Sequence, residues 1–367
     1  MWIENISIRN FRNIESADIQ IGNCNLLIVG ENSQGKTSVL EAIYLFSLFK
    51  SFRSSKRYDV ISFGADFSHL KIRIGNRNGF VTCNAVIDKE AGISVKREGT
   101  LLKRRDIFNL LNVVVFHPGS INLIEGGPDK RRNFIDSVIV KCDPSYLKIL
   151  KLYKRALLQR NALLKKSSVK ERNSQLDVWE NEISNYGAMI RKRRISYIRE
   201  INELIADNFS RIFGRKADIR LTYCGFDESE ESREDIRKEI LKNLIERRQS
   251  DVRFGYTSYG PHRDVINVIS EGQDMKKFSS RGEQRAAVFS LLEAEAERIK
   301  KERGEYPVFL VDDIAAEFDE EREKNFLKAL VEKKMQIIAT ATDIPKEYME
   351  IFRGKIIKIT GGKCTSI

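Results

Sequence analysis

The sequence predicts an α/β fold in which mixed sheets with helices are interrupted by an inserted, mostly helical arm. Three observations support this fold class. Residues 26–49 combine an apolar run, a glycine-rich turn and a helical pattern, and a second apolar run at 307–311 ends in two aspartates. Between them, from 129 to about 212, the chain becomes rich in Lys, Arg, Leu and Glu at helical spacing. A length of 367 residues allows one large domain with an insertion, or two domains.

The first part of the chain is expected to form strands. Residues 2–8 and 17–21 alternate roughly between apolar and polar, as the two strands of a half-buried hairpin do. Further β-like runs occupy 70–74, 80–87 and 113–116.

A glycine-rich loop follows the strand expected at 26–29 and precedes a helix expected from Ser38 to Phe49. It spells G-x-x-x-x-G-K-T with Gly30, Glu31, Asn32, Ser33, Gln34, Gly35, Lys36 and Thr37. Its backbone N–H groups and the helix N-terminus at Ser38 can face phosphates. Lys36 can reach the outer phosphates and act there in catalysis, and the Thr37 hydroxyl can ligate Mg²⁺. The loop therefore predicts a site for a nucleoside triphosphate and Mg²⁺.

The apolar run at 307–311 is typical of a buried parallel strand, and it ends in Asp312 and Asp313. We expect Asp312 to hold Mg²⁺ through water, and Asp313 to orient or deprotonate the attacking water. A further apolar strand is expected at 336–340.

A Ser-x-Gly sequence at Ser280 to Gly282 precedes a helix expected at 286–300. With Glu283 it is similar to the S-x-G-Q signature of ABC-type ATPases. A serine and a glycine at a helix N-terminus can donate hydrogen bonds to an anion, although Ser-x-Gly is also a common helix cap. In ABC-type proteins the anion is the γ-phosphate of ATP held by a second subunit.

The sequence favours two domains. An ABC-type P-loop ATPase head is expected from 1–130 and 252–367, split by an arm at 131–251. In the arm, helical spacing at 147–158 and 183–201 predicts long amphipathic helices that pack antiparallel, with a turn at 165–168. A strand at 219–226 and a charged helix at 230–249 complete it.

The net charge of +12 is compatible with a polyanionic partner and equally with a well-solvated surface. Five scattered cysteines argue against a disulfide framework or a zinc site and suit a reducing cytoplasm. No apolar run approaches the roughly 20 residues of a membrane span. We therefore expect a cytoplasmic protein without a membrane partner.

Taken together, the motifs resemble those of the RecF family of bacterial DNA-repair ATPases, which are related to SMC head domains. The resemblance covers nearly the whole chain. It rests on residues 10–13, 30–37, 41–44, 51–54, 116–118, 127–136, 260–264, 280–284 and 310–313.

The resemblance implies an ATP-dependent DNA clamp that acts in recombinational repair and replication-fork maintenance. Two subunits would sandwich two ATP molecules, each phosphate loop facing the partner subunit's Ser280 and Gly282. The dimer would bind gapped DNA or single-strand/duplex junctions and promote recombinase loading with RecO and RecR partners. Slow hydrolysis, serving as a conformational switch, would release it.

The resemblance also suggests roles for arginines. Arg12 would contact nucleotide phosphate or DNA, but it is equally compatible with an exposed structural role. Arg53, Lys56 and Arg57 belong to a basic loop that suits contacts to the DNA backbone, or that is simply a solvated turn.

The chain departs from the family pattern at several positions. Gly119 and Ser120 stand where acids are common, Glu283 replaces the signature glutamine, and Phe52 replaces a frequent histidine. A negative charge at Glu283 would be unfavourable beside a γ-phosphate unless it points away.

Three other functions remain open on the sequence. An ABC-type subunit of a transporter would have a compact insertion, whereas this one is long and basic. An SMC-like structural chromosome ATPase would have a far longer coiled coil. A nucleotide switch that does not contact DNA would differ from a clamp only in DNA binding.

Overall fold

The computed structural model describes residues 1–54, 56–103, 106, 110–165, 169–223, 232–313, 325, 328–343 and 354–366. The chain forms two compact units. The head unit comprises Met1–Ile121, Asp207–Lys216 and Ser280–Ile367, and the arm unit comprises Asn122–Ala206 and Ala217–Ser279. Compactness alone does not test where independently folding domains begin, so the predicted division at 131 and 251 stays a prediction.

One sheet of the head unit is antiparallel, with strand order β2-β1-β4-β5-β6-β7. The predicted hairpin forms its edge, where Ile6 of β1 pairs with Ile19 of β2 and, on the other side, with Ile72 of β4. The strands are β1 (Trp2–Phe11), β2 (Ile14–Gln20), β4 (Phe67–Asn76), β5 (Gly79–Asp88), β6 (Gly92–Arg97) and β7 (Thr100–Leu101).

The second sheet of the head unit has the order β15-β14-β3-β13-β12-β8 and is parallel except for the edge strand β15. Strands β3 and β12 are buried at all four positions, as strands covered on both faces are. The strands are β3 (Leu26–Val29), β8 (Val113–Phe116), β12 (Val308–Val311), β13 (Ile337–Ala341), β14 (Lys355–Thr360) and β15 (Lys363–Ser366).

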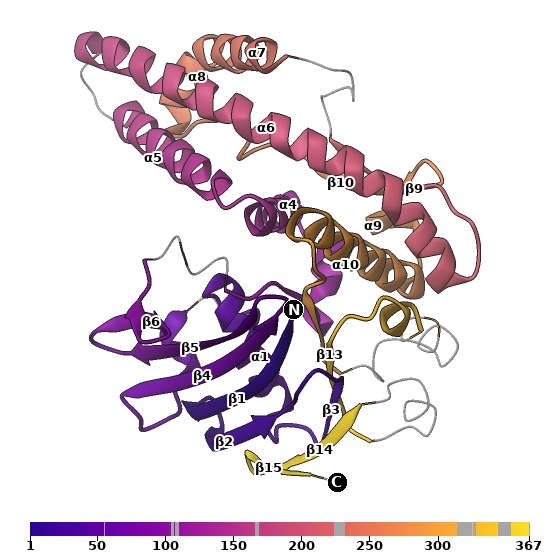
Figure 1. The fold of residues 1–367 in the computed structure, drawn as a ribbon. Coiled ribbons are helices and arrows are strands. Elements are labelled where there is room, and N and C mark those ends of the chain that lie inside the picture. The colour runs from indigo at the N-terminus through magenta and orange to yellow at the C-terminus, as the bar shows by residue number, and fades with distance from the viewer. Residues whose placement is uncertain are drawn as a thin grey trace. The chain divides into compact units, whose positions relative to one another are not determined.

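Helix α1 (Lys36–Leu48) lies between the two sheets of the head unit (Figure 1). It contacts β1 of the antiparallel sheet and β8 and β13 of the parallel sheet. Val39, Ile43 and Phe46 are fully buried in the core that the sheets share. A helix that is apolar on most sides suits this position between two layers.

The remaining helical elements of the head unit are η1 (Arg57–Val60), η2 (Pro118–Ile121) and α10 (Arg281–Arg303). Helix α10 contacts β8 and η2. Its Phe289 packs against Phe116 of β8 and Phe309 of β12. Helix α10, which follows the Ser-x-Gly sequence, therefore packs against the parallel sheet.

The arm unit is mostly helical, as predicted (Figure 1). A three-stranded sheet of order β11-β10-β9 accompanies its helices. The elements are α3 (Asn122–Glu125), α4 (Pro128–Cys142), α5 (Tyr146–Leu164), α6 (Val169–Phe213, which enters the head unit at Asp207), β9 (Ile219–Tyr223), α7 (Arg233–Glu246), α8 (Arg248–Phe254), β10 (Ile266–Ser270), β11 (Gln273–Asp274) and α9 (Met275–Phe278).

One predicted detail of the arm is refined by the structure. From residue 232 on, the charged segment expected as one helix at 230–249 forms α7 and the start of α8, which meet at Arg247, while 230 and 231 lie outside the described residues. The turn expected at 165–168 lies outside the described residues after Lys165, as do residues 224–226 of the strand expected at 219–226. Among the described residues, no helix is long and apolar enough to cross a membrane.

Candidate nucleotide site

The glycine-rich loop connects β3 to α1, as the sequence predicted. Gly35, at the N-cap of α1, has a φ of 111°. Gly30 has a φ of 156°, and a Cβ placed on it would lie 2.4 Å from the carbonyl oxygen of Ile359. Both positions need glycine, because L side chains rarely adopt such conformations and strand β14 leaves no room beside Gly30.

Lys36 is buried at the start of α1. Its Nζ donates to the carbonyl oxygens of Gly30 and, at 3.0 Å, of Glu31. Burial lowers the pKa of Lys36, while the negative charges of Asp313, Asp312 and Asp343 act in the opposite direction. The ammonium therefore lies against the phosphate loop, where two of its three N–H donors bond to loop carbonyls.

The Thr37 side chain meets the end of β12 directly. Its hydroxyl donates to Oδ1 of Asp312 at 2.8 Å, and Thr340 on β13 donates to the same oxygen at 2.9 Å. Burial raises the pKa of Asp312, while the bonds from Thr37 and Thr340 oppose that shift. The hydroxyl and the carboxylate are hard oxygen ligands of the kind that Mg²⁺ prefers, so the pair fits this ion.

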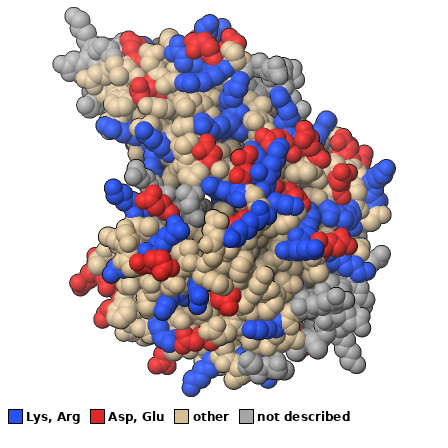
Figure 2. Space-filling model, in the orientation of Figure 1, with Lys and Arg blue, Asp and Glu red and all other residues tan. Residues whose placement is uncertain are grey.

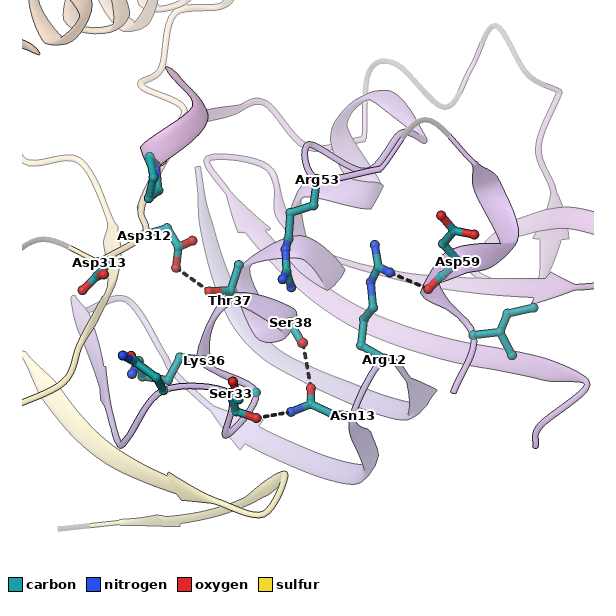
Figure 3. Close-up of a pocket in the computed structure, with 14 residues that line it drawn as sticks. Arg12, Asn13, Ser33, Lys36, Thr37, Ser38, Arg53, Asp59, Asp312 and Asp313 are labelled. Atoms are coloured by element: carbon teal, nitrogen blue, oxygen red, sulfur yellow. Dashed lines mark hydrogen bonds between the residues drawn. The ribbon is translucent and has the colours of Figure 1, made fainter. Parts of the chain in front are cut away.

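Asp313 follows in a left-handed conformation, with a φ of 58°. Its backbone N–H donates to Oγ1 of Thr340 at 2.8 Å. Such a φ is uncommon for a residue other than glycine, and it turns the chain away from the strand after Asp312. The two carboxylates consequently line the same pocket without sharing hydrogen-bond donors (Figure 3).

Arginines form the wall opposite the aspartates (Figure 3). Arg12 donates to both oxygens of the fully buried Glu41, with Nε at 2.9 Å and Nη2 at 2.7 Å. Its Nη1 donates to the carbonyl oxygen of Asp59 at 2.6 Å. Arg53 lies 4.0 Å from Glu41, and Ser51 donates to that carboxylate as well. One carboxylate therefore holds two guanidinium groups beside the pocket.

Further hydrogen bonds brace the loop from both ends of the chain. Asn13 donates to the carbonyl oxygen of Ser33 at 2.7 Å and accepts from Ser38 at 2.8 Å. At the turn between β14 and β15, the Gly361 N–H donates to Oε1 of Gln34 at 2.6 Å. The loop is thus held in shape by residues far from it in sequence.

The pocket has a volume of about 620 Å³, which lies in the range of small-molecule sites. The structure brings most of the predicted phosphate and metal residues to it. Its lining consists of Arg12, Asn13, Asn32, Ser33, Gly35, Lys36, Thr37, Ser38, Arg53, Asp59, Ile61, Pro118, Asp312 and Asp313.

The segment after β8 carries the departures at Gly119 and Ser120. The His117 ring accepts at Nδ1 from the Gly119 N–H at 3.2 Å, and the backbone N–H of His117 donates to Oγ of Ser120 at 3.0 Å. Burial lowers the pKa of His117 to about 4, so the ring is neutral near pH 7. Phe52 packs against it with ring centroids 4.9 Å apart. Gly119 and Ser120 thus belong to a neutral, internally bonded turn.

Ser280 is the N-cap of α10, which begins at Arg281 rather than at the expected 286. The Glu283 carboxylate accepts from the Ser280 N–H at 2.9 Å, and Oγ of Ser280 accepts from the Glu283 N–H at 3.3 Å, which forms a capping box. The Ser280 hydroxyl also donates to that carboxylate at 3.0 Å. Arg215 pairs with Glu283 at 2.5 Å. Burial would raise the pKa of Glu283, but the bonds from Ser280 and Arg215 outweigh it and lower the pKa.

Ser280 and Gly282 are not among the residues that line the pocket. The charge of Glu283, expected to be unfavourable near phosphate, is balanced by Arg215. The predicted contact of Ser280 and Gly282 with a second subunit's nucleotide stays a prediction.

The three basic residues predicted to bind DNA lie in different settings. Arg53 lines the nucleotide pocket, and Lys56 is exposed. The side chain of Arg57 lies outside the described part of the chain. Their proposed contacts with DNA stay predictions.

Sequence reasoning gave no role to Glu41, Asn13, Asp59 or Thr340, although each holds a residue of the pocket in place. A role for Glu41 could have been predicted from the sequence, because a carboxylate on an otherwise apolar helix needs a partner when it is buried. Asp59 contributes a backbone carbonyl, which no side-chain pattern predicts.

A P-loop between a parallel strand and a helix, with acids at the end of β12 two places along the same sheet, defines an ATPase head of the ABC and SMC type. The head domain of an SMC protein bound to the C-winged helix domain of ScpA shares this fold, with a TM-score of 0.58 at 17% identity. The chain belongs to the RecF family: the family model "RecF/RecN/SMC N terminal domain" matches residues 2–361.

Individual relatives align with this chain over nearly their whole length. The DNA replication and repair protein RecF of Lachnospira eligens is 32% identical over 99% of this chain and 98% of its own. That of Geobacter sulfurreducens is 35% identical over 94% and 93%. Among solved structures, one described as the recombination mediator protein RecF-ATP in the RecFOR pathway has a TM-score of 0.90 at 27% identity. The superposition covers 97% of the chain in that structure and 100% of this chain.

Proposed function

We propose that this protein is an ATP-dependent DNA clamp, which dimerises on ATP, binds DNA in that state and is released by slow hydrolysis. The observation that supports this function most strongly is the division of the site. Lys36, Thr37, Asp312 and Asp313 line one pocket in the head unit, whereas Ser280 and Gly282 do not line it. An anion-binding helix start outside the pocket is what a two-subunit site needs.

ATP and Mg²⁺ fit the residues of the pocket. The loop N–H groups and Lys36 would bind the phosphates, and Arg12 and Arg53 would add positive charge at the opposite wall. Thr37 and Asp312 would hold Mg²⁺, which would neutralise charge on the phosphates. Asp313 would orient the attacking water. The relative described as RecF-ATP supports ATP as the nucleotide.

DNA is proposed as the partner because the family acts in DNA replication and repair and because the chain has an excess of 12 positive charges. On the face in Figure 2, Lys and Arg (blue) occur throughout, interspersed with Asp and Glu (red). The DNA would be a gap or a single-strand/duplex junction, and RecO and RecR proteins would be the partners in recombinase loading. The relatives from the RecFOR pathway support these partners.

Two alternatives are weaker. An SMC-like chromosome protein shares the fold with this chain at only 17% identity. The longest described helix of the arm, α6, spans 45 residues, about 68 Å at 1.5 Å per residue, and is far shorter than a chromosome-spanning coiled coil. An ABC-type ATPase that does not act on DNA is the weaker candidate, because the relatives that match over nearly the whole chain are described as DNA replication and repair proteins.

The test measures binding of a labelled gapped duplex with ATP, with ADP and without nucleotide, over a range of salt concentrations. Tight binding that requires ATP and weakens with salt is expected, with a log–log slope near −0.9 per duplex phosphate contacted. Lys36→Ala should abolish the ATP dependence, and the exposed neighbour Lys50→Ala is the matched control. Equal DNA binding with and without ATP would contradict the clamp.

A further inference from the structure

The arm unit has an exposed aromatic pair, Phe254 and Tyr256, at the end of helix α8. Figure 1 labels this helix. Phe254 is 60% exposed and Tyr256 is 43% exposed. Their rings stack on each other, with centroids 5.8 Å apart and planes at 24°. Gly255 between them has a φ of 73° and ends the helix, which allows the next residue to turn back beside the last one.

Three cationic residues lie at or beside this turn. The Arg263 guanidinium lies 5.0 Å from the centre of the Tyr256 ring. The aliphatic stem of Lys165 runs beside Gly255, since a Cβ placed there would be 3.5 Å from Cγ of Lys165. Arg253 is exposed on the last turn of α8. We call these five residues, Lys165, Arg253, Phe254, Tyr256 and Arg263, the stacking patch.

The cations of the stacking patch differ from four arginines of the arm that form ion pairs. Arg160, Arg191, Arg194 and Arg248 each pair with a carboxylate. Within the described residues, no such pair involves Lys165, Arg253 or Arg263. Their charge is therefore available to an outside anion.

A buried network fixes the turn that presents the patch. The Thr257 N–H donates to Oδ1 of Asn161 at 2.8 Å, and the Ser258 N–H donates to Oδ1 of the buried Asp251 at 3.1 Å. His262, next to Arg263, bonds to the Tyr153 hydroxyl at 2.7 Å and to the Thr257 carbonyl at 3.0 Å. A platform held this way loses little conformational entropy when a ligand binds.

We propose that the stacking patch binds single-stranded DNA, with an unpaired base stacked on Phe254 and Tyr256 and the flanking phosphates held by the three cations. Exposed aromatic rings among unpaired cations match the two chemical parts of a single strand, the base face and the phosphate. Bases inside a duplex are already stacked, so the aromatic pair selects for unpaired strand. The proposal rests on the proposed function only in taking DNA as the ligand.

The experiment uses the full-length protein with ATP and three labelled probes: an oligothymidine, an abasic strand of the same length, and a blunt duplex. The double variant Phe254→Ala/Tyr256→Ala should bind oligothymidine about tenfold more weakly or worse, because base–aromatic stacking contributes about that much per base. Its binding to the abasic strand and to the duplex should stay within twofold. Phe63→Ala, which removes a fully exposed ring from the head unit, is the matched control.

A second variant tests the proposed contacts between the cations and the phosphates. Arg253→Gln should lower the magnitude of the log–log salt slope for oligothymidine by about 0.7, as expected for the loss of one phosphate contact on a single strand. The proposal is overturned if the double variant binds oligothymidine like the wild type, or if it weakens all three probes equally. It is also overturned if DNA binding is intact while binding of a RecR-type protein is lost, which would make the patch a protein-binding surface. Absence of ATP-dependent binding to every probe by the wild type would instead refute the proposed function.

Discussion

Replacing Arg160 by methionine should destabilise the arm unit, because this side chain is the fully buried cation between two fully buried acids. Its Nη1 donates to Asp251 at 2.7 Å and to Thr257 at 2.9 Å, while Nε and Nη2 donate to Glu180 at 3.1 and 2.9 Å. Methionine fills a similar volume but compensates neither charge.

The magnitude follows from what remains after the substitution. Glu180 keeps a second partner, Arg248, whereas among the described residues the Asp251 carboxylate keeps the Ser258 N–H alone. One buried carboxylate is then left without a cation, which costs about 3–5 kcal/mol. We take the lower value, about 3 kcal/mol, because the Ser258 bond persists. At about 1.4 kcal/mol per factor of ten, hydrogen exchange of α5–α8 by local opening should accelerate roughly 100-fold.

The assay is hydrogen exchange read by mass spectrometry on the full chain, with peptides from α5 to α8. Arg155→Met is the matched control, since Arg155 lies on the same helix and is exposed. The double variant Arg160→Met/Asp251→Asn should recover part of the loss, because the uncompensated charge is gone. If Arg160→Met accelerates exchange no more than Arg155→Met, the buried network does not hold the arm together as described.

Three further predictions concern the head unit. Lys36→Ala should abolish tight ATP binding in calorimetry, and an unchanged dissociation constant would remove Lys36 from the site. Asp313→Asn should bind ATP normally but hydrolyse it roughly 10²–10⁴-fold more slowly, and undiminished phosphate release would reject its role in activating water. Because the pKa of His117 is about 4 in the folded protein and about 6.5 when unfolded, its neutral burial stabilises the fold above pH 6.5, by about 3 kcal/mol. That stability should be lost as the pH falls from 6.5 towards 4, and a denaturation series in which His117→Asn leaves this slope unchanged would argue against it.

Local patterns were sufficient for the centre of the site. The apolar strand β3, the loop with its glycines and α1 are adjacent in sequence, so their geometry follows from local chemistry. Asp312 and Asp313 could be placed because a buried parallel strand delivers its last residues to one edge of the sheet. Both parts were predicted in nearly their observed positions.

Contacts between segments that are distant in sequence could not be predicted from local patterns. Thr340 reaches Asp312 only because β13 lies beside β12, and Gln34 meets Gly361 only because β14 lies beside β3. Strand order is set by the packing of the whole unit, to which the chain order gives few clues.

The sequence at the start of α10 contains a capping signal that the comparison with the ABC signature did not use. Glu283 was compared with a signature glutamine, yet Ser-x-x-Glu is also a capping box, and the structure forms one. The predicted contact of Arg53 with DNA stays a prediction. Its position near Glu41 follows from the path of a loop that has no periodic pattern, so the sequence does not indicate it.

The central claim is that this chain holds half of each composite nucleotide site and that ATP joins two copies. Sedimentation velocity with a slowly hydrolysed ATP analogue tests it most directly, comparing the wild type with Ser280→Arg and with the control Ser16→Arg, which adds the same charge to an exposed position on β2. Dimers of the wild type and of the control, with monomers of Ser280→Arg that still bind the analogue, are predicted. A normal dimer of Ser280→Arg, or a wild-type chain that stays monomeric with the analogue bound, would contradict the account.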